Sequence, residues 1–412
     1  MLKPTTLILA LALLLNNISL GQSRYIHRIN GSKITASELD KTIIHLMDTA
    51  KVTGVAITIF NKNRVVYQKA FGYGNAATKT PLSANTIFYG ASLSKAVFSV
   101  LVMQLVEEGV IDLDTPLQSY LEKPLSEYGY TKKNTKSWNG YIDLKGDRRY
   151  EKITARMCLT HTTGFPNWRF LTSSGYKKDG KLYFEFDPGV RYSYSGEGFA
   201  LLQFVIEQVT GKGLEELAQE RIFVPLGMSR TSYIYVWQPG QESQYVYGHD
   251  SKQNAIPKDE VDDAGAAGSM GTTLADYSKF LAAVLNQQLL LQDSYKELFK
   301  QHVTIRSKQQ FGPNALVETN ENEDIGLGYG LGWGVFDTPY GKGAFKEGGS
   351  EGYQHYSIIF PETDTGVLIM TNSDNGDSIL KELLERTIGD TYTPWQWESY
   401  IPYDFEHESV SR

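Results

Sequence analysis

Two side chains near residue 92 have the types and spacing needed for acyl transfer at a serine. The tetrapeptide Ser-Leu-Ser-Lys occupies residues 92–95 and begins a strongly apolar stretch. Three residues are nearly one helical turn, so the side chains of Ser92 and Lys95 rise on one face of a helix. A serine hydroxyl becomes an effective nucleophile when a base takes its proton, and burial can lower the pKa of a lysine enough for that task. Taken alone, the tetrapeptide is a weak signal, and a surface helix cap is the default interpretation.

Two further motifs could complete such a site. Tyr-Ser-Tyr-Ser-Gly at residues 192–196 precedes a helical pattern and can present the Tyr194 phenol as a proton relay, if cations stabilise its phenolate. Without further context, a core tyrosine is the preferred interpretation. Lys-Glu-Gly-Gly-Ser-Glu-Gly at residues 346–352 runs into a predicted strand, where glycines let the backbone approach a substrate closely. Its N–H groups could face an oxyanion, with Lys346 supplying positive charge nearby. A plain β-bulge is the alternative here.

The third motif also contains a formal Gly-x-Ser-x-Gly at residues 348–352, which would make Ser350 the nucleophile of an α/β-hydrolase. That motif requires a strand before the serine and a helix after it, within alternating βαβ units. Here a strand is predicted after Ser350, and the Asp and His that should follow could only be residues such as Asp374 and His407. We therefore prefer Ser92 as the nucleophile.

Both chain ends supply elements for one antiparallel sheet. Thr35 and Glu38 form a possible capping box at the start of a helix that Gly54 is expected to end. Two strand pairs and a final helix near residues 379–388 are predicted. The strands span residues 55–60 and 64–69 near the N-terminus, and residues 356–360 and 367–371 near the C-terminus.

The middle of the chain is predicted to be mainly helical. Residues 92–108 are apolar on most faces and must form a buried helix, a second helix ends at Gly211, and Thr273 can cap a third. The fold class is therefore α+β, with a helical lobe of about residues 91–328 inserted in a sheet lobe of about residues 35–90 and 329–390.

The last residues, 391–412, form an aromatic C-terminal tail. It contains Trp395, Trp397, Tyr400, Tyr403 and Phe405, too many aromatic side chains for a free solvent tail. We expect it to pack back onto the body, over either the cleft or the sheet.

Composition narrows the functional classes. The 412 residues carry a formal net charge of −7 without a basic block, which argues against nucleic acid as a partner. The single cysteine, Cys158, is expected to be a buried structural thiol, and seven scattered histidines show no metal-binding spacing. We expect no metal, no cofactor and no transmembrane anchor, with a small molecule or peptide as substrate; the oligomeric state stays open.

The first residues resemble a secretory signal. Lys3 precedes an apolar run, and small residues lead to Gly21. We expect residues 1–21 to be removed and residues 22–390 to form the hydrolase domain of an exported, periplasmic or secreted, soluble protein.

The order and spacing of the three motifs resemble those of the class C β-lactamase and penicillin-recognising serine hydrolase family. Its usual motifs are SxxK, YxN and KTG or HxG. Further similar segments occur at residues 159–166 (Leu-Thr-His-Thr-Thr-Gly-Phe-Pro), 188–211, 225–228 (Pro-Leu-Gly-Met) and 329–333 (Tyr-Gly-Leu-Gly-Trp). The resemblance extends from about residue 37 to about residue 390. It implies a β-lactamase/transpeptidase-like fold, with an antiparallel sheet flanked by N- and C-terminal helices.

The resemblance also implies residue roles. Ser92 would be the acylated nucleophile, Lys95 the proton acceptor and Tyr194 a second acid/base group. The backbone N–H groups of Ser92 and Gly349 would form the oxyanion hole, beside Gly348. Lys346 would hold a substrate carboxylate or support the Tyr194 phenolate.

One residue near the motifs is given no catalytic role, and two others depart from the family's usual motifs. His161 is expected to be structural, because the family keeps this residue away from the nucleophile. Gly196 stands where the family most often has Asn, so one side-chain hydrogen bond to a substrate amide is missing. Glu347 replaces the usual Thr and either adds an anion beside Lys346 or points to solvent.

The predicted function is that of a serine acyl hydrolase working through an acyl-enzyme on Ser92. Its substrate would be an amide or ester of β-lactam, D-amino-acid peptide or ester type. The Gly196 change favours an esterase or peptidase with weak β-lactam activity. The alternatives are a catalytically weakened cell-envelope binding protein on the same fold and the α/β-hydrolase with Ser350.

Overall fold

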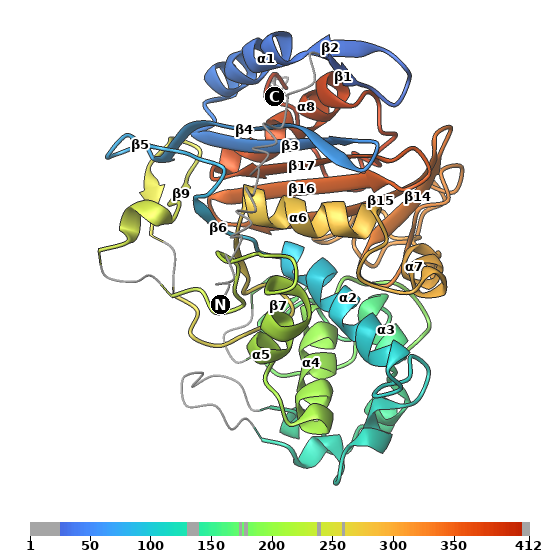
Figure 1. The fold of residues 1–412 in the computed structure, drawn as a ribbon. Coiled ribbons are helices and arrows are strands. Elements are labelled where there is room, and N and C mark those ends of the chain that lie inside the picture. The colour runs from blue at the N-terminus through green and yellow to red at the C-terminus, as the bar shows by residue number, and fades with distance from the viewer. Residues whose placement is uncertain are drawn as a thin grey trace, which may run out of the picture.

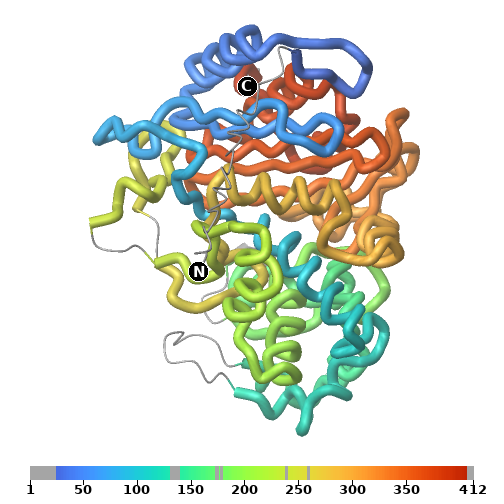
Figure 2. Tube along the Cα trace, viewed as in Figure 1, coloured from blue at the N-terminus to red at the C-terminus, as the bar shows by residue number. Residues whose placement is uncertain are grey.

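A computed structural model describes most of the chain and contains one large antiparallel sheet. The described residues are 25–129, 140–172, 175–176, 180–236, 240–257 and 260–405. Within them the large sheet has nine strands in the order β12-β13-β14-β15-β16-β17-β3-β4-β5. Strand β17 pairs with β3, Val367 lying opposite Ile59, so segments from the two ends of the chain lie side by side, as the red and blue tubes of Figure 2 show. The predicted α+β class and the sheet built from both chain ends are confirmed.

The strands of the large sheet are β3 (Gly54–Asn61), β4 (Arg64–Asn75), β5 (Thr80–Pro81), β12 (Val303–Thr304), β13 (Gly328–Tyr329), β14 (Gly334–Thr338), β15 (Gly341–Ser350), β16 (Tyr353–Phe360) and β17 (Thr365–Thr371). The short two-stranded sheets pair β1 (Tyr25–His27) with β2 (Lys33–Thr35), β6 (Ile87–Tyr89) with β11 (Gly271–Thr273), β7 (Leu171–Thr172) with β8 (Gly175–Tyr176), and β9 (Gly248–His249) with β10 (Ala255–Ile256).

Helices cover both faces of the sheet (Figure 1). The eight α-helices of the described residues are α1 (Ala36–Ala50), α2 (Leu93–Glu107), α3 (Ala155–Leu159), α4 (Gly196–Thr210), α5 (Leu214–Ala218), α6 (Leu274–Leu285), α7 (Gln292–Phe299) and α8 (Leu380–Thr387). Helices α1 and α8 pack on one face, α6 and the start of α2 lie on the other, and α3, α4 and α5 gather below α2 in a helical lobe.

The first helix shows how local sequence sets an element's bounds. The Thr35 side chain accepts a hydrogen bond from the Glu38 N–H, and the Glu38 carboxylate accepts one from the Thr35 N–H, which completes the predicted capping box. The prediction that Gly54 ends this helix is wrong. Lys51 caps the helix in the left-handed conformation, with φ 57°, and Gly54 already begins β3.

Helix α2 is the buried helix expected from its composition. Almost all of its residues are buried, because it lies between the sheet and the helical lobe and contacts α5, α7 and β15. A helix that is apolar on all sides needs such a position, because each of its faces must be buried away from solvent. Cys158 on α3 is buried in the same core, and burial raises the pKa of its thiol.

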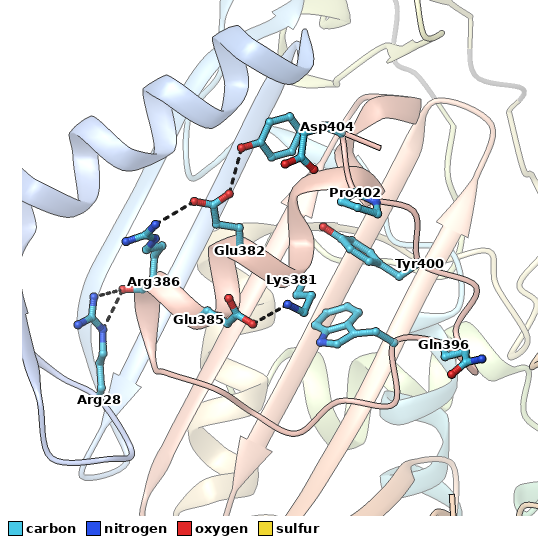
Figure 3. Close-up of a pocket in the computed structure, with 11 residues that line it drawn as sticks. Arg28, Lys381, Glu382, Glu385, Arg386, Gln396, Tyr400, Pro402 and Asp404 are labelled. Atoms are coloured by element: carbon cyan, nitrogen blue, oxygen red, sulfur yellow. Dashed lines mark hydrogen bonds and ion pairs between the residues drawn. The ribbon is translucent and has the colours of Figure 1, made fainter. Parts of the chain in front are cut away.

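The aromatic tail folds back onto the sheet lobe over residues 391–405; residues 406–412 lie outside the described ranges. Trp397 is 1% exposed, and its indole Nε1 donates to Ser307 Oγ at 3.0 Å. The Trp397 carbonyl accepts from the Gln310 N–H at 2.9 Å, which joins the tail to the loop before β13. Figure 3 shows the tail against α8, where Tyr403 donates to Glu382 at 3.1 Å.

The predicted signal segment, residues 1–21, lies outside the described residues. None of the helices in the described ranges is long and apolar enough to cross a bilayer.

Candidate active site

The start of α2 brings the first two predicted site residues together. Ser92 occupies the N-cap position, but its side chain makes no capping hydrogen bond, so the helix-cap alternative does not describe this hydroxyl. Lys95 Nζ lies 3.1 Å from Ser92 Oγ. The preceding residue, Ala91, has φ 46°, a left-handed conformation that is costly for a residue with a side chain. This strained turn sets Ser92 at the junction between β6 and α2.

The environment of Lys95 favours its neutral form. The side chain is 1% exposed, and Nζ also donates to the Ala267 carbonyl at 2.5 Å. Burial lowers the pKa of Lys95 well below its usual value, the nearby Lys346 lowers it further, and Glu347 partly opposes both. A neutral amine keeps a lone pair that can accept the Ser92 proton.

The second serine of the tetrapeptide has a different task. Ser94 is fully buried, and its Oγ donates to the Ala91 carbonyl at 2.6 Å. The same oxygen accepts from the Met270 N–H at 3.1 Å. Its hydrogen-bonding capacity therefore supports the turn that presents Ser92.

Tyr194 lies between two lysines. Lys346 Nζ donates to the Tyr194 phenol oxygen at 3.1 Å. The ring centroid is 4.9 Å from Lys95 Nζ and 5.0 Å from Lys346 Nζ, both within cation–π range. Burial nevertheless raises the pKa of Tyr194, and Glu347 raises it too, against the opposing effects of Lys346 and a hydrogen bond from Ser92. The resting group is thus a neutral phenol, which can donate a proton.

Glu347 faces Lys346 and does not point to solvent. Its Oε1 lies 2.9 Å from Lys346 Nζ and accepts from Gln310 Nε2 at 2.7 Å. Burial lowers the pKa of Lys346, but the Glu347 charge and the hydrogen bonds reverse this, so the net shift is upward. The positive charge of Lys346 is therefore largely compensated inside the protein, and less of it remains for a substrate carboxylate.

The glycines of the third motif allow the sheet to approach α2. Strand β14 pairs with β15 only as far as Gly334 opposite Phe345, so one edge of residues 346–350 is not paired with β14. A Cβ on Gly348 would lie 2.7 Å from the Gly90 carbonyl oxygen, a distance that real contacts do not allow. Gly349 lines the same cavity as Ser92, and a Cβ there would meet the flexible Gln354 side chain at 3.2 Å.

His161 supports Tyr194 from behind. The two rings stack with centroids 4.1 Å apart, and His161 Nδ1 accepts from the Ser195 N–H at 2.9 Å. Its Nε2 lies 3.3 Å from the Tyr329 hydroxyl. Burial and the two lysines lower the pKa of His161 well below its usual value, so the ring is neutral. These contacts agree with a structural residue.

The space left by the missing Asn at position 196 is occupied. A Cβ on Gly196 would lie 2.9 Å from the Asn167 carbonyl oxygen and 3.0 Å from the Trp168 ring. The Gly196 N–H donates to Asn167 Oδ1 at 3.1 Å. Arg169 ties this loop to α4 through an ion pair of 2.8 Å with Glu197, both side chains being almost fully buried. The Asn167-Trp168 loop therefore forms the wall of the cleft here.

All of the predicted motifs meet at one cavity of about 350 Å³. Ser92, Tyr194, Gly348 and Gly349 line it, while Lys95 and Lys346 stand behind this surface. Sequence reasoning missed several lining side chains that lie in loops and in the tail: Asn167, Trp168, Gln310, Phe311, Asp377 and Glu398. Of these residues, Glu398 could have been suspected from the sequence, because the aromatic residues of the tail predicted that the tail packs on the body. A larger hollow of about 780 Å³ between α8 and the tail does not include Ser92 (Figure 3).

Ser350 also lines the cavity, but its surroundings differ from a nucleophile elbow. It ends β15 and pairs with Tyr353, so a two-residue turn and then strand β16 follow it. An elbow needs a helix at this point. The α/β-hydrolase alternative is therefore wrong, because residues 341–360 form a hairpin inside an antiparallel sheet.

Comparison with known proteins agrees with this geometry. The sequence matches the family described as Beta-lactamase over residues 39–387. Penicillin-binding protein 4* of Bacillus subtilis (strain 168) is 24% identical over 78% of this chain and 68% of that protein. A lovastatin esterase of Penicillium rubens is 26% identical, over 71% of this chain and 82% of the esterase. A D-aminopeptidase of Brucella anthropi is 28% identical, over 73% of this chain and 56% of that enzyme.

Solved structures show the same architecture. The octameric penicillin-binding protein homologue from Pyrococcus abyssi superposes with a TM-score of 0.67 and 22% identity, over 87% of this chain and 78% of that chain. At 22% identity this likeness establishes the fold alone. The fold is β-lactamase/transpeptidase-like, which confirms what the resemblance of the motifs implied. The similar proteins thus include a penicillin-binding protein, an esterase and an aminopeptidase. The family match covers most of the chain, and this protein belongs to the beta-lactamase family of serine hydrolases.

Proposed function

We propose that this protein is a serine acyl hydrolase that works through an acyl-enzyme on Ser92. The observation that carries the proposal is the 3.1 Å separation of Ser92 Oγ and Lys95 Nζ, in a site that lowers the pKa of the lysine. Nucleophile and base are within hydrogen-bond reach, and the base is buried enough to be neutral. The cavity beside Ser92 leaves room for a substrate.

The reaction begins when Ser92 Oγ attacks the carbonyl carbon of an ester or amide and its proton passes to Lys95 Nζ. The backbone N–H groups of Ser92 and Gly349 face the developing oxyanion. Tyr194, a neutral phenol 3.1 Å from Lys346 Nζ, donates a proton to the leaving oxygen or nitrogen as its bond to the carbonyl carbon breaks. Water then attacks the acyl-enzyme and passes a proton to the Tyr194 phenolate, while Lys95 returns its proton to Ser92 Oγ as the bond from Oγ to the acyl carbon breaks; the carboxylic acid product is released and all three groups are restored.

Among acyl donors, esters and peptides are favoured over β-lactams. Glu347 compensates much of the Lys346 charge, which reduces attraction for the carboxylate that a β-lactam carries. The Asn167-Trp168 loop fills the position where an Asn side chain would meet a substrate amide. Relatives named as an esterase and as an aminopeptidase support this choice.

A fluorophosphonate probe with mass spectrometry tests the nucleophile. We expect one adduct on Ser92, no adduct in Ser92→Ala, and labelling that persists in Ser350→Ala. Full labelling of Ser92→Ala would overturn the assignment. Turnover of nitrocefin, p-nitrophenyl esters and D-Ala-D-Ala peptides then ranks the substrates. No turnover and no covalent adduct in the wild-type protein would favour a binding protein on this fold.

Export is part of the same proposal. The basic and apolar N-terminal segment supports removal of residues 1–21 during secretion. N-terminal sequencing of the mature protein after expression in a secreting bacterium should read from residue 22. A mature protein that starts at Met1 and stays in the cytoplasm would contradict it.

A further inference from the structure

The cavity beside Ser92 is lined by acidic side chains. Among the described residues that line it, Glu347, Asp377 and Glu398 carry carboxylates, and no Lys or Arg is present. The lining histidine, His355, has its pKa lowered to about 4 by burial and is therefore neutral near pH 7. Lys346, which stands behind the surface, is already paired with Glu347 at 2.9 Å.

These carboxylates are incompletely compensated by the protein. Glu398 Oε1 accepts one hydrogen bond, from the Tyr356 phenol at 3.2 Å. Glu347 Oε2 is buried without a hydrogen-bond partner in the described part of the chain. Burial raises the pKa of Glu398 well above its usual value, and repulsion by Glu347 and Asp377 raises it further; burial also raises the pKa of Asp377. Without a cation, these raised pKa values favour the neutral acids; an ammonium group placed among them would stabilise the carboxylates and lower their pKa values, so that binding is coupled to loss of a proton from the cleft.

Aromatic side chains complete the lining. Tyr89, Trp168, Phe311 and Tyr356 line the same cavity as the carboxylates. Aromatic faces attract organic cations, and the attraction is strongest where water is excluded. None of the described residues forms a group of three or more His, Cys, Asp or Glu side chains that could hold a metal ion. The combination of carboxylates and rings therefore matches an organic cation better than a metal.

The tail holds its carboxylate in a defined place. Glu398 follows Trp397, which is buried against Ser307 and joined through its carbonyl to the Gln310 N–H. Asp377 belongs to the short 3-10 helix Asp374–Ile379 that leads into α8. Glu347 lies on β15. Three separate segments thus bring a carboxylate to the cavity that contains Ser92.

We propose that this cleft selects ester or amide substrates that carry a protonated amino group, with Glu398 and Asp377 as the residues that determine this specificity. The proposal rests on acyl transfer at Ser92, and adds the charge class of the substrate. It follows from the acidic and aromatic lining of the cavity and from the tail that closes its wall.

A matched series of rigid esters tests the proposal. We suggest p-nitrophenyl esters of 4-(aminomethyl)benzoate, 4-ethylbenzoate and 4-(carboxymethyl)benzoate, which are positive, neutral and negative. For the wild-type protein we expect kcat/KM for the ammonium ester to exceed that for the neutral ester by about tenfold, and the carboxylated ester to be poorest. In Glu398→Gln and Asp377→Asn the ratio of ammonium to neutral ester should fall toward one.

The control variant is Glu385→Gln. It removes the same charge from α8, where Glu385 pairs with Lys381 at 2.9 Å and does not line the cavity. Its ammonium-to-neutral ratio should equal that of the wild-type protein. Equal kcat/KM for ammonium and neutral esters in the wild-type protein, or an unchanged ratio in both cleft variants, would overturn the proposal.

A binding measurement separates this proposal from the catalytic one. Calorimetric titration of Ser92→Ala with benzylammonium and with benzyl alcohol needs no acylation. We expect benzylammonium to bind more tightly, and this preference to be lost in the Ser92→Ala/Glu398→Gln protein but kept in Ser92→Ala/Glu385→Gln. If the protein prefers benzylammonium but turns over no ester, the acyl-transfer proposal fails and the ammonium subsite stands. If the protein turns over esters but does not prefer benzylammonium to benzyl alcohol, the ammonium subsite fails and the acyl-transfer proposal stands.

Discussion

Lys346 Nζ lies 2.9 Å from Oε1 of Glu347, its neighbour in the chain; Glu347 lines the cleft, and the buried Lys346 stands behind it. This ion pair sets the charge around Lys95, the proposed general base. Lys346 lowers the pKa of Lys95, whereas Glu347 raises it. The pair also holds the Tyr194 phenol, through the 3.1 Å hydrogen bond from Lys346.

The pH dependence of activity should move in opposite directions when either partner is removed. Activity requires neutral Lys95, so kcat/KM rises as the pH passes the pKa of that lysine. Glu347→Gln removes an anion that raises this pKa, and the acid limb should move to lower pH. Lys346→Met removes a cation that lowers it, and the limb should move to higher pH. Glu351→Gln, exposed on the turn between β15 and β16, serves as the control. Shifts of the same sign in both variants would contradict Lys95 as the base.

Removal of the base should reduce turnover without unfolding the protein. Lys95→Met replaces a buried amine by an apolar chain of similar length, so we expect Tm to be maintained. The loss of general-base catalysis should lower kcat for p-nitrophenyl esters by about 10²–10⁴-fold. Ester kinetics and thermal unfolding check the two expectations. Turnover within a few fold of the wild-type rate would contradict the assigned role.

Restoring Asn at position 196 should destabilise the protein. The new Cβ would meet the Asn167 carbonyl and the Trp168 ring at 2.9–3.0 Å, and we expect Gly196→Asn to cost about 1–3 kcal/mol in the free energy of unfolding. Trp168→Ala in the same protein should recover part of this loss. The control is Gly213→Asn, which has open space and an N-cap position that suits Asn. Denaturant unfolding measures all variants; equal stability of Gly196→Asn and wild type would refute the steric argument.

The tail should contribute to both stability and activity. Trp397→Ala removes a fully buried indole and its hydrogen bond to Ser307, with an expected loss of about 3–5 kcal/mol. The loop that carries Phe311, whose ring lies 5.1 Å from that of Tyr194, should loosen, and kcat/KM should fall. Gln396→Ala, exposed in the same tail, is the matched control. Differential scanning calorimetry and ester kinetics test this; an unchanged Tm would contradict the packing.

Much of the fold could be predicted from the sequence because its signals are local. The capping box at Thr35, the helix stop at Gly211 and the two strand pairs depend on neighbouring residues, and each is found where it was expected. The exception at Gly54 has a local cause as well, since Lys51 adopts the left-handed conformation that a glycine normally provides.

The sequence by itself determined the three motifs, the family and the α+β class, because spacing and hydrophobic periodicity are properties of the chain. Only the tertiary structure decided that Glu347 turns to Lys346, that Trp168 occupies the space beside Gly196, and that Glu398 lines the cleft. The Trp168 and Glu398 contacts join segments far apart in sequence, and the Glu347 side chain turns to Lys346 because the folded protein buries both of them together. The low pKa of Lys95 has the same origin, since burial and neighbouring charges exist only after folding.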